Sequence, residues 1–116
     1  MTQTAGFSDQ EQFKLDLHGA FIRRTTLRGA RLERANLAGA DCAGADFSFT
    51  NLKSANLTGA NFSKASLRGA DLEDANLAGT DFRGADLTDA RNLTARQLRE
   101  AIVDEATRLP ELVLER

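Results

Sequence analysis

Residues 35–44 read Ala-Asn-Leu-Ala-Gly-Ala-Asp-Cys-Ala-Gly, and this five-residue pattern recurs in fifteen consecutive units between Leu15 and Asp89. Every unit has an apolar residue at its centre. Two positions before the centre stands Ala in eleven units and Thr in three, and the position between is Asp or Asn in eleven. Gly stands two positions after the centre in eight units. A repeat of this regularity outweighs every other signal in the 116-residue chain.

A period of five fits neither an ordinary helix nor a flat strand. On an α-helix the centres would advance by about 140° per unit and leave no polar face. On a flat strand successive centres would point to opposite sides, because five is odd. The chain must therefore turn once per unit, with the small and the large residue pointing inward and the polar residue between them pointing outward. Gly suits the third position of a type II turn, where φ is positive.

The pattern A-[DN]-L-x-x resembles that of the pentapeptide-repeat proteins. The resemblance covers about two-thirds of the chain. It implies an all-β fold, a right-handed four-sided parallel β-helix with four units per coil. Fifteen units then make about 3.75 coils, and a C-terminal capping α-helix follows them.

Stacking the sequence at twenty residues gives coherent columns. One column of centres is Leu17, Leu37, Leu57 and Leu77. Asp16 would lie below a column of asparagines at positions 36, 56 and 76, and Glu33, Lys53 and Glu73 would alternate in sign. Because like charges directly opposite each other destabilise a sheet, these columns favour the four-sided register.

The pattern divides the chain into three parts. Residues 1–14 are predicted to form an N-terminal cap or a frayed partial coil, with Phe7 or Phe13 as its plug and Phe21 packed beneath it. Residues 15–91 form the β-helix. Residues 92–116 form a capping helix and a tail, because Thr94 and Gln97 make a capping box that predicts a helix at about 95–107. Leu112, Val113 and Leu114 would pack on this helix or meet another subunit.

Composition excludes several classes of protein. The formal net charge of −2 lacks the basic excess of a nucleic-acid binder, and a single Cys excludes an internal disulfide or a multi-Cys metal site. No stretch is long and apolar enough to span a membrane, and the N-terminus has no leader pattern. We therefore expect a cytoplasmic protein that binds neither a membrane nor a small-molecule substrate. The family that it resembles has many bacterial members.

The candidate chemical groups predict no catalysis. His18 is the only His and is expected at a solvated corner, where no second ligand can join it. Cys42 occupies a centre position and is expected to be a small buried hydrophobe. The rows of Asp are interleaved with Asn and Ser, which indicates solvated ladders and no calcium site. We expect neither a cofactor nor a metal, and no enzyme activity.

Two surface features stand out as candidate partner contacts. Phe49 sits at a corner between Gly29 and Gly69 in its column, where it either contacts a partner or packs along the coil. The charge is also unequal along the axis. The first coil carries Arg23, Arg24, Arg28, Arg31 and Arg34. The last carries Asp71, Glu73, Asp74, Asp81, Asp86 and Asp89. These charges are either simply solvated or make a bipolar rod that binds a partner at one end or associates head to tail.

The leading functional hypothesis is a non-catalytic structural or protein-interaction module, a short rigid rod that presents its outward side chains to a protein partner. The resemblance also offers an alternative, the DNA mimics that occupy the DNA site of gyrase. A rise of about 18 Å, or roughly five base pairs, and a basic first coil disfavour that role. Dimerisation through the C-terminal segment would lengthen the rod, and the sequence leaves a homodimer open. No nucleic-acid partner is expected.

Overall fold

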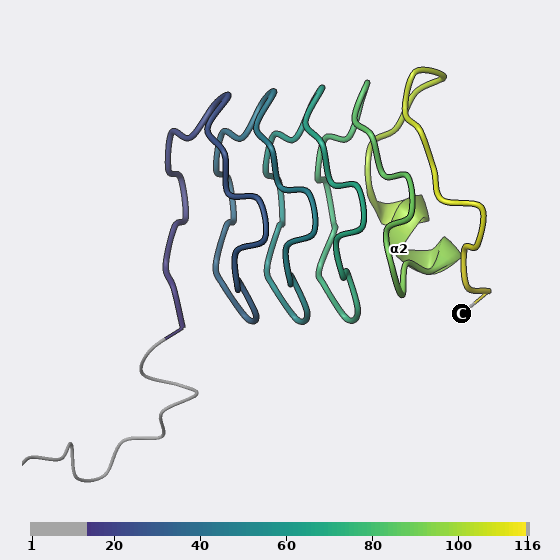
Figure 1. Ribbon diagram of the computed structural model, residues 1–116, viewed down its shortest axis with the longest axis horizontal. Coiled ribbons are helices and arrows are strands. Elements are labelled where there is room, and N and C mark those ends of the chain that lie inside the picture. The colour runs from purple at the N-terminus through teal and green to yellow at the C-terminus, as the bar shows by residue number, and fades with distance from the viewer. Residues whose placement is uncertain (1–13, 116) are drawn as a thin grey trace, which may run out of the picture.

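The computed structural model describes residues 14–115, which wind into a stack of coils lying side by side (Figure 1). The predicted N-terminal cap, with Phe7 or Phe13 as its plug, lies outside the described residues except for Lys14. Among residues 14–115 no helix is long and apolar enough to cross a membrane.

Parallel bridges join residues that are twenty apart in the sequence. On one side of the stack Asp16 pairs with Asn36, Asn36 with Asn56, and Asn56 with Asn76. The other three sides repeat this arrangement with their own columns, which begin at Phe21, Thr26 and Arg31. Four bridged columns with a step of twenty residues confirm the predicted register and the four-sided shape of each coil.

Every backbone amide of a typical repeat has a hydrogen-bond partner. In the unit that spans residues 35–39, one amide closes the turn, three donate to the coils on either side, and one donates to a side chain. The donors and acceptors are Ala35 to Leu32 O (3.0 Å), Asn36 to Leu15 O (2.8 Å), Leu37 to Asn56 O (2.8 Å), Gly39 to Thr58 O (2.9 Å) and Ala38 to Asn36 Oδ1 (3.0 Å). Unpaired buried amides are costly, so this complete pairing accounts for the precision of the repeat.

The Asp or Asn before each centre has a structural task. In all eleven units that carry one, its Oδ1 accepts a hydrogen bond from the amide two residues later. These side chains are Asp16, Asn36, Asp41, Asp46, Asn51, Asn56, Asn61, Asp71, Asn76, Asp81 and Asp86. This amide lies at the start of the turn, where the neighbouring coil offers it no carbonyl. The polar columns therefore hold the corners and are more than solvated ladders.

All fifteen corners have a residue with positive φ, between 57° and 74°, two positions after the centre. The predicted corner conformation is confirmed. Eight of these residues are Gly, and the other seven are Arg24, Arg34, Phe49, Ser54, Lys64, Asp74 and Asp89. Residues with a Cβ atom adopt this conformation at a cost of about 1–2 kcal/mol each. The stack therefore holds seven corners at which Gly would be less strained.

The core is one continuous cluster of apolar side chains inside the coils, to which all four columns of centres contribute. Phe47, Phe62 and Phe82 are fully buried, one in each of three successive coils. The rings of Phe47 and Phe62 meet edge to face with centroids 4.9 Å apart, and the centroids of Phe62 and Phe82 lie 5.9 Å apart. Cys42 is also fully buried, as predicted, and belongs to the same core cluster.

The C-terminal helix α2, Ala95–Glu100, closes one side of the last coil. The predicted capping box is confirmed, because Thr94 Oγ1 accepts from the Gln97 amide and the Gln97 side chain accepts from the Thr94 amide. Gln97 Nε2 also donates to the carbonyls of Leu72 (2.8 Å) and Ala75 (2.9 Å). Leu72 O already accepts from the Ala75 amide, whereas no backbone amide of residues 14–115 donates to Ala75 O, so the buried Gln97 supplies its donor.

The prediction of a helix at about 95–107 is wrong in its extent, because α2 ends at Glu100. From Ile102 onward the chain forms backbone bonds with the edge of the preceding coil. Ile102 donates to Thr80 O (2.8 Å) and accepts from the Phe82 amide (2.7 Å). Arg108 pairs with Asp86 and Leu114 with Thr94 in the same parallel manner. The edge of the β-helix offers partners for these backbone groups and competes successfully with the helix.

We expect the Asx hydrogen bonds to contribute measurably to stability. Replacement of Asn56 by Ala removes the acceptor for the Thr58 amide, which lies 3.1 Å from Oδ1. The free energy of unfolding should fall by about 1 kcal/mol. Asn56→Asp keeps the acceptor and should stay within about 0.5 kcal/mol of the parent. Urea unfolding followed by circular dichroism measures both variants, and equal losses would contradict the role of the acceptor.

The strained corners predict the opposite effect for one substitution. Ser54 is exposed and has a φ of 59°. Replacing it with Gly relieves the strain but frees the unfolded chain, so the net gain in unfolding free energy should be about 0.5–1 kcal/mol. Ser54→Ala keeps the Cβ atom and serves as the control, with no gain expected. Thermal and urea unfolding should rank the Gly variant first; a less stable Gly variant would show that the corner is not strained.

Candidate interaction surface

Phe49 is the most unusual residue on the outside of the stack. It occupies a corner with a φ of 61°, and 53% of its surface is exposed. Its ring lies over Gly69 of the next coil, so closely that a Cβ atom built on Gly69 would come within 2.6 Å of the ring. The ring therefore packs along the coil, as one of the two sequence alternatives had it, and still keeps half of its surface open to solvent.

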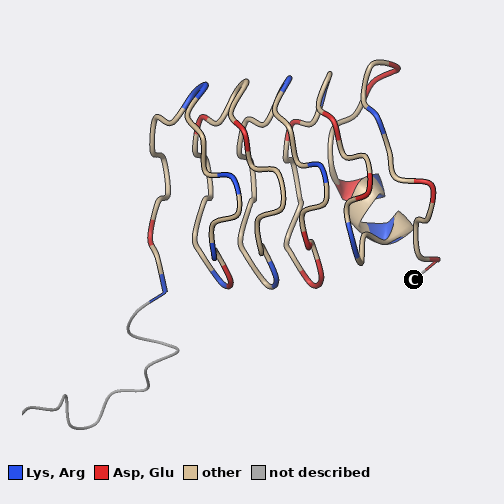
Figure 2. Cartoon of the chain, in the orientation of Figure 1, with Lys and Arg blue, Asp and Glu red and all other residues tan. Residues whose placement is uncertain are grey.

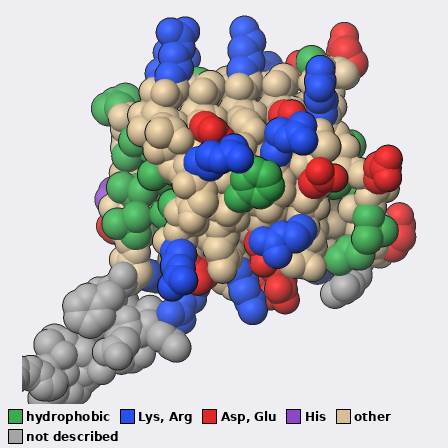
Figure 3. Space-filling model, in the orientation of Figure 1, with side chains coloured by type: hydrophobic (Ala, Val, Ile, Leu, Met, Phe, Trp, Pro, Cys, Tyr) green, Lys and Arg blue, Asp and Glu red, His purple; other side chains and the backbone are tan. Residues whose placement is uncertain are grey.

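The neighbours of Phe49 are basic and polar. The Arg28 guanidinium lies 4.7 Å from the centre of the ring, at the distance of a cation–π contact. Arg68, one coil further on, forms an ion pair with Asp86 at 3.6 Å. Figure 3 shows this mixture of basic, acidic and hydrophobic side chains across one face of the stack. An aromatic ring beside arginines is typical of the residues that dominate protein interfaces.

The other arginines of the first coil are not gathered around Phe49. Arg23 pairs with Asp41 at 3.3 Å, and the aliphatic part of Arg24 lies against Gly44. Arg31 is exposed on another side, where its backbone pairs with Asn51. Arg34 occupies a strained corner, with a φ of 59°. Of the five predicted arginines, the structure brings only Arg28 together with the aromatic ring.

The three apolar residues of the tail do not form one surface. Leu114 is part of the last coil, since its amide donates to Leu93 O at 2.8 Å. Val113 is half-buried, whereas Leu112 is 72% exposed. Only Leu112 is therefore available in full as a contact.

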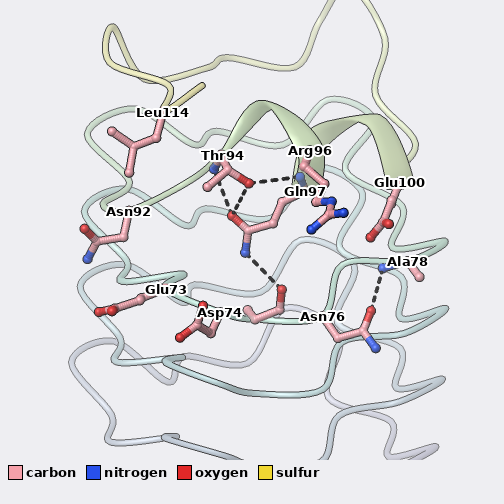
Figure 4. Close-up of a pocket in the computed structure, with 11 residues that line it drawn as sticks. Glu73, Asp74, Asn76, Ala78, Asn92, Thr94, Arg96, Gln97, Glu100 and Leu114 are labelled. Atoms are coloured by element: carbon pink, nitrogen blue, oxygen red, sulfur yellow. Dashed lines mark hydrogen bonds between the residues drawn. The ribbon is translucent and has the colours of Figure 1, made fainter. Parts of the chain in front are cut away.

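A groove beside α2 was not predicted from the sequence. It has a volume of about 650 Å³ and lies between the helix and the coil below it (Figure 4). Glu73, Asp74 and Glu100 give it three carboxylates, and Arg96 gives it one cation. The sequence predicts a helix that continues beyond Glu100, whereas the groove lies beside the shorter helix that the structure has. The sequence therefore contains no indication of the groove. Within residues 14–115 no cluster of three or more potential metal ligands occurs.

The two residues considered for chemistry lie in unreactive places. The His18 ring is exposed and its Nδ1 is 2.8 Å from Asp16 Oδ1, a contact between neighbours at one corner. Burial raises the pKa of the Cys42 thiol to about 12, and the Asp41 charge adds to the shift. A thiol that is neutral at physiological pH and fully buried is a poor nucleophile.

Comparison with known proteins gives the family. The sequence model of the pentapeptide repeats matches eight copies, over residues 30–69, 55–91 and 65–103. The chain belongs to the pentapeptide-repeat family. This membership implies the right-handed quadrilateral β-helix, of which the bridges at steps of twenty residues are the direct structural sign. No curated protein matches the chain in sequence.

Solved structures of other pentapeptide-repeat proteins are similar to this chain. Rfr23, from the cyanobacterium Cyanothece 51142, is 30% identical with a TM-score of 0.74, over 81% of this chain and 63% of Rfr23. HetL, from the cyanobacterium Nostoc sp. PCC 7120, is involved in the regulation of heterocyst differentiation. It is 25% identical with a TM-score of 0.52, over 88% of this chain and 58% of HetL. This chain thus spans about three-fifths of the length of either relative.

The carboxylates of the Asx columns predict a dependence of stability on pH. Hydrogen bonds from Ser48 hold the pKa of Asp46 below its usual value, and those from Arg83 do the same for Asp81. A lowered pKa in the folded state gives a stabilisation that is complete above the unfolded pKa of about 4 and is lost as the pH falls through the folded value. Urea unfolding at neutral pH and at about pH 3 should show this loss.

Asp46→Asn is the matched control for the pH experiment. It keeps an oxygen acceptor for the Ser48 amide, which lies 2.9 Å from Oδ1, but cannot titrate. The loss of unfolding free energy between neutral and acid pH should be smaller in this variant. An unchanged loss would show that Asp46 does not contribute to the acid sensitivity.

Proposed function

We propose that this chain is a non-catalytic module that binds a protein partner, and that Phe49 with Arg28 forms the centre of the contact. The observation that carries the proposal is the conformation of Phe49, a bulky aromatic residue held at a φ of 61° with half of its surface exposed. Both neighbours in its column, Gly29 and Gly69, are glycines.

The fold gives little reason for an aromatic residue at this corner. Gly would adopt the required φ without strain, and eight of the fifteen corners use it. The contacts of the ring with Gly69 and Arg28 offset part of the backbone strain energy. A ring that served packing alone would bury more of its surface inside the coil. Six other corners hold a residue with a Cβ atom at a similar φ, but only Phe49 combines this strain with a half-exposed aromatic ring. Strained backbone clusters at binding and switch sites, which supports a contact role for this ring.

The surroundings of Phe49 indicate the chemistry of the partner. Arg28 lies against the ring, while Arg68 flanks Gly69 and is half-exposed. A partner that places an apolar or aromatic side chain on the ring and a carboxylate near the guanidinium groups would satisfy both features. The proposed partner surface is therefore mixed, apolar at its centre and acidic at its edge.

A non-catalytic role agrees with the placement of the reactive groups. Cys42 is buried with a raised pKa, and His18 contacts only Asp16 at an exposed corner. Nothing in the described charge distribution specifically favours the alternative of a DNA mimic, since the first coil carries five arginines. The cytoplasmic location expected from the sequence remains part of the proposal.

The experiment compares partner capture by two variants that carry the same kind of substitution. Phe49→Gly removes the ring and relieves the corner, so the stability of the fold should stay within about 1 kcal/mol of the parent. Ser54→Gly relieves the next corner and leaves the ring in place. Each protein is immobilised and incubated with lysate of the native cell, and retained proteins are quantified by mass spectrometry.

We expect a protein that the parent and Ser54→Gly retain to at least a tenfold higher level than Phe49→Gly does. Equal retention by all three forms would remove Phe49 from the contact. If none of the three forms retains any protein specifically, the proposal of a binding module is wrong. Circular dichroism spectra that match among the three forms exclude loss of fold as the cause.

A further inference from the structure

The N-terminal end of the described stack is an open sheet edge. In the inner coils the residue before each centre donates its amide to the preceding coil, as Asn36 does to Leu15 O. The corresponding amides of the first coil have no hydrogen-bond partner among residues 14–115. They belong to Asp16, Phe21, Thr26 and Arg31. Unpaired edge amides are the groups through which a further strand can join a sheet.

The same end is apolar. Phe21 is 88% exposed and Leu15 is 47% exposed, and the centres Leu17, Ile22 and Leu27 are only partly buried, whereas those of the inner coils are fully buried. Phe21 also stands in a column that continues with Asp41, Asn61 and Asp81. An aromatic residue has replaced the side chain that would hold the corner, as expected if this position serves a contact.

The C-terminal end of the stack is also an open sheet edge, and its unpaired amides are those that would donate to a following coil. At each inner junction the centre amide of one coil donates to the following coil, as Leu37 does to Asn56 O. The amides of Val103 and Leu109 occupy this position in the last coil and have no partner among residues 14–115. Val103, Leu109 and Leu112 are exposed by 42%, 46% and 72%. The two ends thus hold the two halves of one junction between coils.

The charges of the two ends are opposite. Residues 15–34 carry five arginines against Asp16 and Glu33, a net charge of +3. Residues 92–115 carry three arginines against five acidic residues, a net charge of −2. Acidic residues are visibly concentrated toward the C-terminal end of the stack (Figure 2), and Figure 3 shows hydrophobic side chains at both ends. Unlike ends therefore attract, and two N-terminal ends repel.

We propose that a second copy of this chain docks its N-terminal coil on the C-terminal coil of the first, so that the parallel β-helix continues across the junction. Phe21 and Thr26 would lie over Ile102 and Arg108, the residues that already extend their columns on two sides. On the third side Arg31 would meet the end of the chain, where the last bridge joins Leu114 to Thr94. On the fourth side the incoming coil meets α2. Because the two surfaces differ, the contact is heterologous and each added copy presents the same free end again. The product is an open chain of copies.

The first experiment measures the mass of the full chain by sedimentation velocity over a range of concentrations. The mean mass should rise with concentration beyond that of a dimer, and more strongly at about 0.05 M salt than at about 0.5 M salt. Phe21→Asn should weaken this association at least about tenfold. Asn restores the side chain that the column uses, an acceptor for the Arg23 amide, so the variant should remain folded.

A charge exchange identifies which ends meet. Arg24→Glu with Arg31→Glu reverses the N-terminal end, and Glu105→Arg with Glu111→Arg reverses the C-terminal end. Either pair alone makes both ends alike and should abolish self-association. Mixing the two double variants, or combining all four substitutions in one chain, makes unlike ends again and should restore it.

Four results would overturn the proposal. The first two are a monomer at every concentration and salt level, and a mean mass that does not exceed that of the dimer. The third is self-association that the charge exchange does not change. The fourth is self-association that is seen only after Phe7 and Phe13 are replaced by Ser. The last result would assign the open edge to residues 1–13 of the same chain. Partner capture through Phe49 is measured separately, so either proposal can fail while the other stands.

Discussion

Five backbone amides in every repeat need partners, and the rest of the structure follows from how they are paired. In a typical inner repeat, four donate to backbone carbonyls within the turn or in neighbouring coils. The fifth, just after the centre, donates to the Asp or Asn side chain two residues before it. This requirement fixes the polar residue, the turn and the step of twenty residues together. The apolar centres then fill the tube without having to determine its geometry, and so Cys, Leu and Phe can share one role.

Most of the fold could be predicted because the repeat states the same information fifteen times. The columns, the corners with positive φ and the capping box at Thr94 and Gln97 all follow from spacing. The extent of α2 does not follow from spacing. Local helix propensity predicts a helix that continues beyond Glu100, but Ile102 instead pairs its backbone with the edge of the preceding coil. The role of the Asp and Asn side chains was missed because spacing shows that a residue points outward, not which amide it accepts from.

The candidate surface was less predictable than the fold. The sequence placed Phe49 between two glycines, but only the structure shows that Arg28 covers its ring and that the other first-coil arginines lie elsewhere. Outward positions obey no repeat, so their neighbours across coils must be worked out one at a time. The groove bordered by Glu73 and Glu100 depends on where the helix ends, and therefore could not be predicted from the sequence.

The step of twenty residues also constrains how such a chain can change length. An insertion or deletion of twenty residues adds or removes one coil and leaves the later columns in place. A deletion of five keeps every type of hydrogen bond but turns all later side chains by one side of the square. The loss of residues 55–59, for example, would move Arg68 to a different side from Phe49. The interior tolerates any whole number of repeats, whereas the pattern on the surface survives only whole coils.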